Sequence, residues 1–196
     1  MPDARISPPE SLATERLLLR KPRPEDAPLI FAGYAQDPEV VRYLTFLPHR
    51  DARDAEAVLE RFLESWRSGK SYCWLIFRRG GEELVGAISA RADQGINLGY
   101  LLARPFWGQG FMSEALSAIV EWAFSIPTVF RVWAVCDLEN EASARLLERN
   151  GFNQEGILRS WSLHPNVSDT PRDCYCYART RSEARSSDSP TSAIRD

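Results

Sequence analysis

The sequence has no apolar run near the ~20 residues that a membrane-spanning helix requires. Its N-terminal stretch MPDARISPPESLA also lacks the apolar centre of a secretion signal. These absences predict a cytoplasmic protein without a membrane partner. The formal net charge of -3 provides no basic field, so nucleic acid is not an expected partner either. A chain of 196 residues suits one domain with a full hydrophobic core, as a monomer or a homodimer.

Histidine and cysteine are scarce, with two histidines, His49 and His164, and four cysteines. Among the cysteines, only Cys174 and Cys176 are close, and in a strand they would share one face. Two thiols do not complete a zinc site, and the histidines stand in distant segments. We therefore expect no metal, and cysteines that are reduced and half-buried.

Composition divides the chain into three parts. Residues 1–13 carry three prolines and few apolar groups, so we interpret them as a partly disordered leader. Residues 14–181 form the single folded domain of this prediction. Residues 182–196 are rich in serine and almost free of large apolar groups, which predicts a disordered tail.

The apolar pattern of the body predicts an α+β fold. Pro24, followed by two acids, predicts the start of a first helix, and Asp51 and Gly69 are expected to bound a second. Helices are expected over 24–36, 51–69, 113–124 and 140–151, and strands over 17–20, 72–77, 84–90, 96–102, 132–136, 152–158 and 174–178. A meander of strands followed by helical crossovers implies a central mixed sheet of about seven strands, flanked by helices.

A Gly-x-Gly turn, Gly108 to Gly110, stands between a strand that ends near Leu102 and an amphipathic helix. Glycines let a ligand approach backbone N–H groups, and the helix N-terminus adds unpaired donors and a positive partial charge. The pattern predicts an anion site suited to a pyrophosphate. The turn lacks the Gly-Lys-Ser/Thr of a Walker loop, and Ser113 replaces the third glycine of a dinucleotide fingerprint. Taken by itself, the Gly-x-Gly pattern favours a purely structural strand-to-helix turn.

A second cluster lies about 30 residues downstream. Asn140 and Ser143 are three apart, so both fit the first turn of one helix. As structural residues they are a helix cap and a small polar side chain.

With both clusters in this order, the chain resembles the GNAT acetyltransferase superfamily, and within it the Rim-type branch of ribosomal-protein and small-molecule N-acetyltransferases. LGYLLARPFWGQGFMSEAL is similar to the pyrophosphate-loop motif of that branch, and NEASARLLERNGF is similar to its Asn-x-x-Ser helix. TERLLLRKPRPEDA, the stretch from Glu155 to Arg159, and the pair Arg172 and Asp173 also match. The resemblance spans about Thr14 to Arg181 and implies a GNAT-like acyl-CoA N-acyltransferase fold.

The resemblance implies acetyl-CoA as the co-substrate, with pantetheine in a gap where the strand before the turn splays from its neighbour. Leu101 and Leu102 would contact the pantetheine, which Asn140 would fix. Ser143 would lie near the thioester sulfur as a general acid, unless a nearby tyrosine has that role. The pyrophosphate would be held by the turn and the helix start, through Trp107, Gly108, Gln109, Gly110, Phe111, Met112 and Ser113.

The implied reaction transfers an acetyl group to a primary amine, a protein N-terminus or a small molecule, by direct attack in a ternary complex. On the acceptor side we single out Trp161, His164 and Asp173, which lie near the last two strands. Trp161 would line the acceptor groove, and His164 is either a general base or an exposed loop residue. Asp173 and Asp93 are possible bases, although a turn or capping role is more usual for such acids.

The chain departs from the family pattern at two positions. Pro105 replaces an Arg or Gln, so one potential phosphate donor is missing. Asn97 replaces a Glu, which leaves the general base unassigned. This second departure motivates an alternative function, a non-catalytic acyl-CoA-binding sensor, and a third hypothesis is a structural domain that binds no acyl-CoA.

Overall fold

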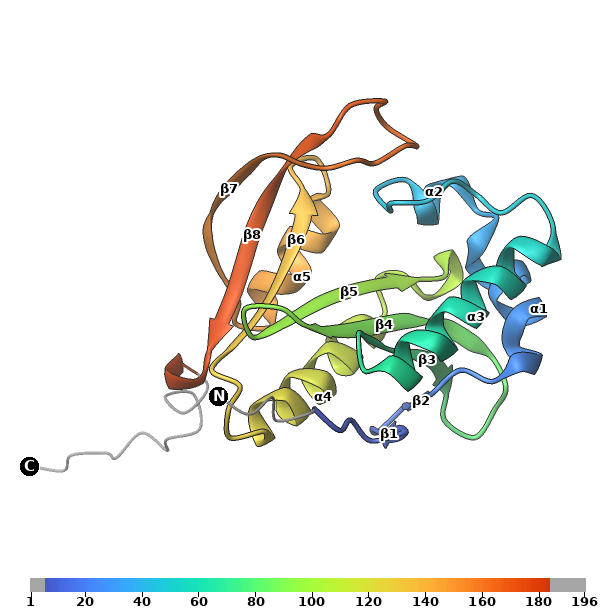
Figure 1. Cartoon of the computed structure of the whole chain (residues 1–196), viewed down its shortest axis with the longest axis horizontal. Helices are drawn as coiled ribbons and strands as arrows, with labels where there is room; N and C mark the ends of the chain where they lie inside the picture. The colour runs from blue at the N-terminus through green and yellow to red at the C-terminus, as the bar shows by residue number, and fades with distance from the viewer. Residues whose placement is uncertain (1–5, 184–196) are drawn as a thin grey trace, which may run out of the picture.

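The computed structural model describes residues 6–183, which form one mixed sheet with helices packed against it (Figure 1). The strand order is β1-β2-β3-β4-β5-β6-β8-β7, and every neighbouring pair is antiparallel except the parallel pair β5–β6. The predicted α+β architecture is therefore confirmed. The strands are β1 (Ser11–Ala13), β2 (Leu17–Arg20), β3 (Tyr72–Arg78), β4 (Leu84–Ala92), β5 (Ile96–Leu102), β6 (Arg131–Asp137), β7 (Asn153–Ser162) and β8 (Arg172–Thr180).

Local sequence signals start and stop the helices. The Asp51 side chain accepts a hydrogen bond from the N–H of Arg53, and Gly69 ends the same helix with a left-handed φ of 73°. The helices are α1 (Ala27–Ile30), α2 (Pro38–Val41), α3 (Ala52–Ser68), α4 (Phe111–Ser125) and α5 (Glu141–Arg149). A 3₁₀ turn at Pro24–Asp26 precedes α1, and a π-helical turn at Phe31–Ala35 follows it. Together these three cover the first helix that the sequence predicts.

The hydrophobic core lies between the sheet and the helices. β3 is buried from Tyr72 to Phe77, as expected for a strand covered on both faces. α4 contacts β2, β4, β5 and β6, whereas α3 contacts β3 and α1. The predicted α4 stripe, Leu116, Ile119, Val120 and Ala123, is buried. Burying a large aliphatic side chain stabilises the fold by about 1.5–3 kcal/mol, so this stripe fixes α4 beneath the sheet.

The N-terminal boundary of the prediction is wrong, because β1 adds an eighth strand ahead of Thr14. The backbone before β1 is also held. The Tyr72 hydroxyl donates to the carbonyl of Ile6 at 2.7 Å, and the Trp74 indole donates to that of Pro9 at 2.9 Å. The polar composition of this segment gave no sign of these contacts, because the partners that hold it lie in β3. Residues 1–5 lie outside the described part of the chain.

At the other end, Glu183 belongs to the fold rather than to the expected tail. Its carboxylate accepts from the N–H of Thr180 at 2.7 Å and from Asn153 Nδ2 at 2.8 Å. The rest of the predicted tail, residues 184–196, lies outside the described residues. The short helix α2 was not expected from the sequence. No helix between residues 6 and 183 is long and apolar enough to cross a membrane.

Candidate functional site

The Gly-x-Gly turn links β5 to α4 through a 3₁₀ turn at Arg104–Phe106. Gly108 and Gly110 have left-handed φ angles of 72° and 78°, a conformation that costs other residues about 1–2 kcal/mol. The first backbone bond of the helix runs from the N–H of Glu114 to the carbonyl of Gly110, at 3.1 Å. Within residues 6–183, no acceptor pairs with the consecutive N–H groups from Gly108 to Ser113. The turn therefore carries the unpaired donors that an anion site at a helix N-terminus requires.

Side chains of the turn fold back onto the segment before it. The Trp107 indole donates to the carbonyl of Leu102 at 2.9 Å, and Gln109 Nε2 donates to that of Pro105 at 2.7 Å. Ser113 Oγ donates to Asn150 Oδ1 at 3.1 Å, which ties α4 to the end of α5. These contacts stabilise the loop and use the side-chain donors of Trp107, Gln109 and Ser113. The backbone N–H groups of the loop are then the donors that can bind an anion.

Beside the turn, the backbones of β5 and β6 stop pairing and diverge, and we call the region between the diverging strands the wedge. Their parallel pairing covers Ile96 to Leu98 and ends where Leu98 meets Ala134. Beyond this point the two strands diverge, as Figure 1 shows. Leu101 and Leu102 thus lie on the part of β5 that is unpaired on its β6 side, half-buried. This is the splayed geometry that the sequence resemblance implies for the pantetheine arm.

β4 supports the other side of β5 unusually closely. A Cβ added to Gly86 would lie only 2.3 Å from the carbonyl oxygen of Leu101, so this position of β4 accepts glycine alone. The close approach helps to define where Leu101 and Leu102 stand at the mouth of the wedge.

The first turn of α5 spans the wedge. Asn140 Oδ1 caps α5 by accepting from the N–H of Ser143 at 3.2 Å. Among the described residues, the Asn140 amide nitrogen has no partner. Ser143 Oγ lies 2.8 Å from the hydroxyl of Tyr100 on β5, so the two hydroxyls join α5 to the opposite wall. Tyr100 is thus the tyrosine beside Ser143, which the sequence suggested only in general terms.

Burial controls the ionisation of the groups in the wedge. It raises the pKa of Tyr100 well above its ordinary value, although the bond to Ser143 opposes this shift. It also raises the pKa of the Cys136 thiol, on β6, to about 11, again against a hydrogen bond from Ser143. At neutral pH both Tyr100 and Cys136 are protonated, so the Tyr100 hydroxyl is available as a proton donor.

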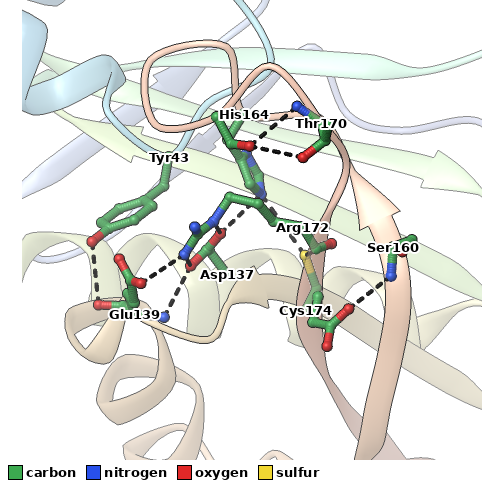
Figure 2. Close-up of polar contacts among 10 residues, drawn as sticks. Tyr43, Asp137, Glu139, Ser160, His164, Thr170, Arg172 and Cys174 are labelled. Atoms are coloured by element: carbon green, nitrogen blue, oxygen red, sulfur yellow. Dashed lines mark hydrogen bonds and ion pairs between the residues drawn. The ribbon is translucent and has the colours of Figure 1, made fainter.

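A buried ion pair lies at the end of β6 (Figure 2). The Asp137 side chain is fully buried and accepts from Arg172 Nε at 2.6 Å and Nη2 at 3.0 Å. It also accepts from the N–H of Glu139 at 2.9 Å, and Glu139 in turn pairs with Arg172 at 2.9 Å. Burial raises the pKa of Asp137, but Arg172 and the Glu139 N–H outweigh burial and hold it below its ordinary value.

His164 is buried beside this pair rather than exposed on a loop. Its Nε2 lies 3.8 Å from Asp137 Oδ2 and 3.8 Å from Cys174 Sγ, while its Nδ1 has no partner among the described residues. In the same loop, Asn166 Nδ2 donates at 2.8 Å to the carbonyls of both Val41 and Phe46. The β7–β8 loop is therefore fastened to α2 and the segment after it.

The other predicted acceptor-side residues occupy different surroundings. Trp161 on β7 is 51% exposed, and its ring is free to meet a ligand. The Asp173 carboxylate accepts from the N–H of Ser160 at 2.8 Å and pairs with Arg159. These partners lower the pKa of Asp173, so it is ionised and structurally engaged at neutral pH. Asp93 lies in the β4–β5 turn, at the opposite end of β5 from Leu102.

The family model described as the acetyltransferase (GNAT) domain matches residues 16–153. The uncharacterized N-acetyltransferase YoaA of Bacillus subtilis (strain 168) is 34% identical over 171 residues, which cover 85% of this chain and 94% of that protein.

Two solved structures share the fold at lower identity. RimL, a ribosomal L7/L12 alpha-N-protein acetyltransferase solved with coenzyme A, has a TM-score of 0.77 at 22% identity, over 87% of this chain and 98% of that one. The microcin C7 self-immunity acetyltransferase MccE, solved with acetyl-CoA and AMP, has a TM-score of 0.76 at 19% identity, over 85% of this chain and 93% of that one. The chain therefore belongs to the GNAT acetyltransferase family, as an acetyl-CoA-dependent N-acetyltransferase.

Proposed function

We propose that the enzyme transfers the acetyl group of acetyl-CoA directly to a primary amine, with both substrates bound at the wedge between β5 and β6. The observation that carries this proposal is the juxtaposition of the unpaired N–H groups of Gly108 to Ser113 with the wedge, which contains paired hydroxyls. The first feature suits a diphosphate, and the second suits a thioester. The first lies at the start of α4 and the second at the start of α5.

In the proposed donor site, the N–H groups of Gly108 to Ser113 bind the diphosphate, with Trp107 and Gln109 fastening the loop. Leu101 and Leu102 line the pantetheine path along the unpaired edge of β5. The Asn140 amide nitrogen donates to a pantetheine carbonyl, because its oxygen is already used as the cap of α5. A β-strand N–H at the wedge stabilises the oxyanion that develops on the acetyl carbonyl.

The reaction needs few side chains once both substrates are held together. The uncharged amine nitrogen attacks the thioester carbonyl carbon and the carbon–sulfur bond breaks. The nitrogen loses one proton to solvent water as the amide forms, and the leaving sulfur gains one proton. We assign this last proton to Ser143, which Tyr100 can recharge through their 2.8 Å contact.

In this proposal the acceptor enters beside the β7–β8 loop, on the side of the exposed Trp161 ring. Trp161 contacts the acceptor through its exposed ring. His164 and Asp173 shape this side through the contacts described above, with His164 against the Asp137–Arg172 pair and Asp173 against β7. RimL acts on a ribosomal protein, whereas MccE was solved with AMP. Protein N-termini and small-molecule amines are accordingly the two acceptor classes to compare.

A two-stage experiment tests the proposal. Calorimetric titration with CoA should show saturable binding with one site per chain. Incubation with acetyl-CoA and a library of amines, amino acids and N-terminal peptides should then release free thiol and give an acetylated product by mass spectrometry. CoA binding without turnover on any acceptor would favour a sensor, and the absence of CoA binding would rule out the donor site.

Replacing Asn140 separates its two roles. Asn140→Ala removes both the cap and the amide donor, so it should destabilise the protein by about 1 kcal/mol and raise the acetyl-CoA KM about tenfold. Asn140→Asp keeps a capping oxygen and loses the donor. Its Tm should stay at or above that of the wild type, because a negative charge suits a helix N-terminus, while the KM rises as in the alanine variant. An Asp variant with an unchanged KM would show that Asn140 is only a helix cap.

A further inference from the structure

The Arg16 side chain reaches the glycine turn from the start of β2. Arg16 Nη1 donates to the carbonyl of Gln109 at 3.0 Å, and Nε pairs with Glu114 Oε2 at 2.6 Å. The guanidinium carbon lies 4.5 Å from the centroid of the Phe111 ring. These three partners belong to the turn or to the first turn of α4, so Arg16 fastens both to the edge of the sheet.

Glu114 holds Arg16 in this position from two sides. Its Oε1 accepts from the N–H of Arg16 at 2.8 Å and from Thr14 Oγ1 at 2.5 Å, while Oε2 accepts from the Arg16 side chain. Burial raises the pKa of Glu114, but these donors outweigh burial and lower it. The ionised carboxylate, 17% exposed, thus anchors a guanidinium that is 44% exposed.

The hydrogen bond from Arg16 to the Gln109 carbonyl also affects the direction of the next backbone N–H group, that of Gly110. The peptide between Gln109 and Gly110 is trans, so its C=O and N–H point in opposite directions. Because Arg16 holds the carbonyl on the β2 side, the Gly110 N–H points away from Arg16. We propose that Arg16 is a positioning residue that aims the Gly110 N–H at the diphosphate of acetyl-CoA, a role that rests on the proposed function.

Charge around the turn supports the same role. Pro105 supplies neither an N–H nor a cation, and Arg104 is engaged with Asp37 at 2.6 Å. Glu114 would place an uncompensated negative charge at the helix end that is to bind an anion. Arg16 neutralises that charge, and its Nη2, which has no hydrogen-bond partner within residues 6–183, lies 3.5 Å from the position of a Cβ on Gly110. The Arg16–Glu114 pair therefore leaves the start of α4 without a net negative charge that would repel an anion.

The test is Arg16→Met, which keeps an apolar stem on Phe111 and removes the donors. The CoA dissociation constant, measured by calorimetry, should rise about tenfold to a hundredfold, since a hydrogen bond from a charged group is lost along with neutralisation of Glu114. With an accepted amine, the KM for acetyl-CoA should rise while kcat changes little. Turnover of S-acetyl-pantetheine, which has no diphosphate, should stay at the wild-type level.

Two further variants sharpen the result. Arg16→Lys keeps the positive charge but lacks the planar guanidinium group, and it should recover part of the CoA affinity. Arg79→Met is the matched control, because Arg79 binds the carbonyl of Thr14 at 2.9 Å in the same region without touching the turn, and it should bind CoA normally.

An Arg16→Met protein with unchanged CoA affinity would overturn the assignment and leave the proposed function intact. An equal loss of turnover of S-acetyl-pantetheine in Arg16→Met would also overturn the assignment, because it would show general damage to the site. If the wild-type protein does not bind CoA, the proposed function fails first, and the role of Arg16 fails with it.

Discussion

Replacing Arg172 by methionine is expected to lower the free energy of unfolding by about 3–5 kcal/mol, because it strands a buried charge. The Asp137 side chain is fully buried, and without Arg172 the N–H of Glu139 is the only close donor left to it among the described residues. Replacing the other partner, Asp137→Asn, should lower the free energy of unfolding by less. Arg172 is 24% exposed and still pairs with Glu139, so its charge is not left without a partner. Urea denaturation followed by circular dichroism measures both losses.

The double variant Asp137→Leu with Arg172→Met should recover most of the loss, because an apolar pair leaves no buried charge without a partner. Glu64→Gln on α3 is a control for loss of an exposed ion pair, since Glu64 pairs with Arg67 at the surface, and it should hardly change stability. A small loss in Arg172→Met, similar to that of Glu64→Gln, would contradict the assigned role of the pair.

The same pair predicts how the loss depends on pH. The pKa of Asp137 is lower in the folded state than the value of about 3.9 for an unfolded chain. The carboxylate therefore contributes stability above pH ~4, and this contribution is lost as the pH falls through the folded pKa. In Arg172→Met, burial is no longer opposed by the guanidinium, so the variant's Asp137 takes up a proton at a higher pH than the unfolded chain does and regains stability there. The stability difference between wild type and Arg172→Met should therefore be largest at neutral pH, should begin to shrink above pH ~4 and should shrink further below it.

Ser143→Ala is expected to lower kcat about a hundredfold, at the lower end of the range for loss of a general acid, with little change in the acetyl-CoA KM. The hydroxyl is the group that we propose protonates the leaving sulfur, and it contacts Tyr100 at 2.8 Å. Tyr100→Phe keeps the ring and removes the proton relay, so kcat should fall about tenfold, or about 1.4 kcal/mol of barrier. Initial rates of thiol release at saturating acetyl-CoA give both values.

A donor thioester with a more acidic leaving thiol tests whether the loss concerns protonation. Such a thiolate leaves more easily without a proton, so the deficit of Ser143→Ala should become smaller. Ser117→Ala is the matched control, because its hydroxyl contacts Asn150 outside the wedge, and it should keep full activity. If Ser143→Ala keeps the wild-type kcat and raises only the KM, Ser143 is a donor-binding residue without a role in proton transfer.

Elements with strong local signals were predicted closely from the sequence. The span of α3 between Asp51 and Gly69 and the start of α5 at Asn140 follow from caps and helical spacing. β5 ends at Leu102, as its apolar pattern indicated. Each of these signals acts within a few residues along the chain, so it can be seen without the fold. β1 was missed because it is held by pairing with β2, while the segment before it is held by side chains of β3.

The glycine turn and the Asn140–Ser143 pair could be found from the sequence alone, since left-handed backbone and helix capping depend on neighbouring residues. Only the tertiary structure brought together contacts between distant segments. Arg16 meets Glu114 across 98 positions of sequence, Tyr100 meets Ser143 across 43, and Arg172 meets Asp137 across 35. Such contacts depend on strand order and on the splay of β5 from β6, which arise from packing of the whole sheet and leave no periodic trace in the sequence.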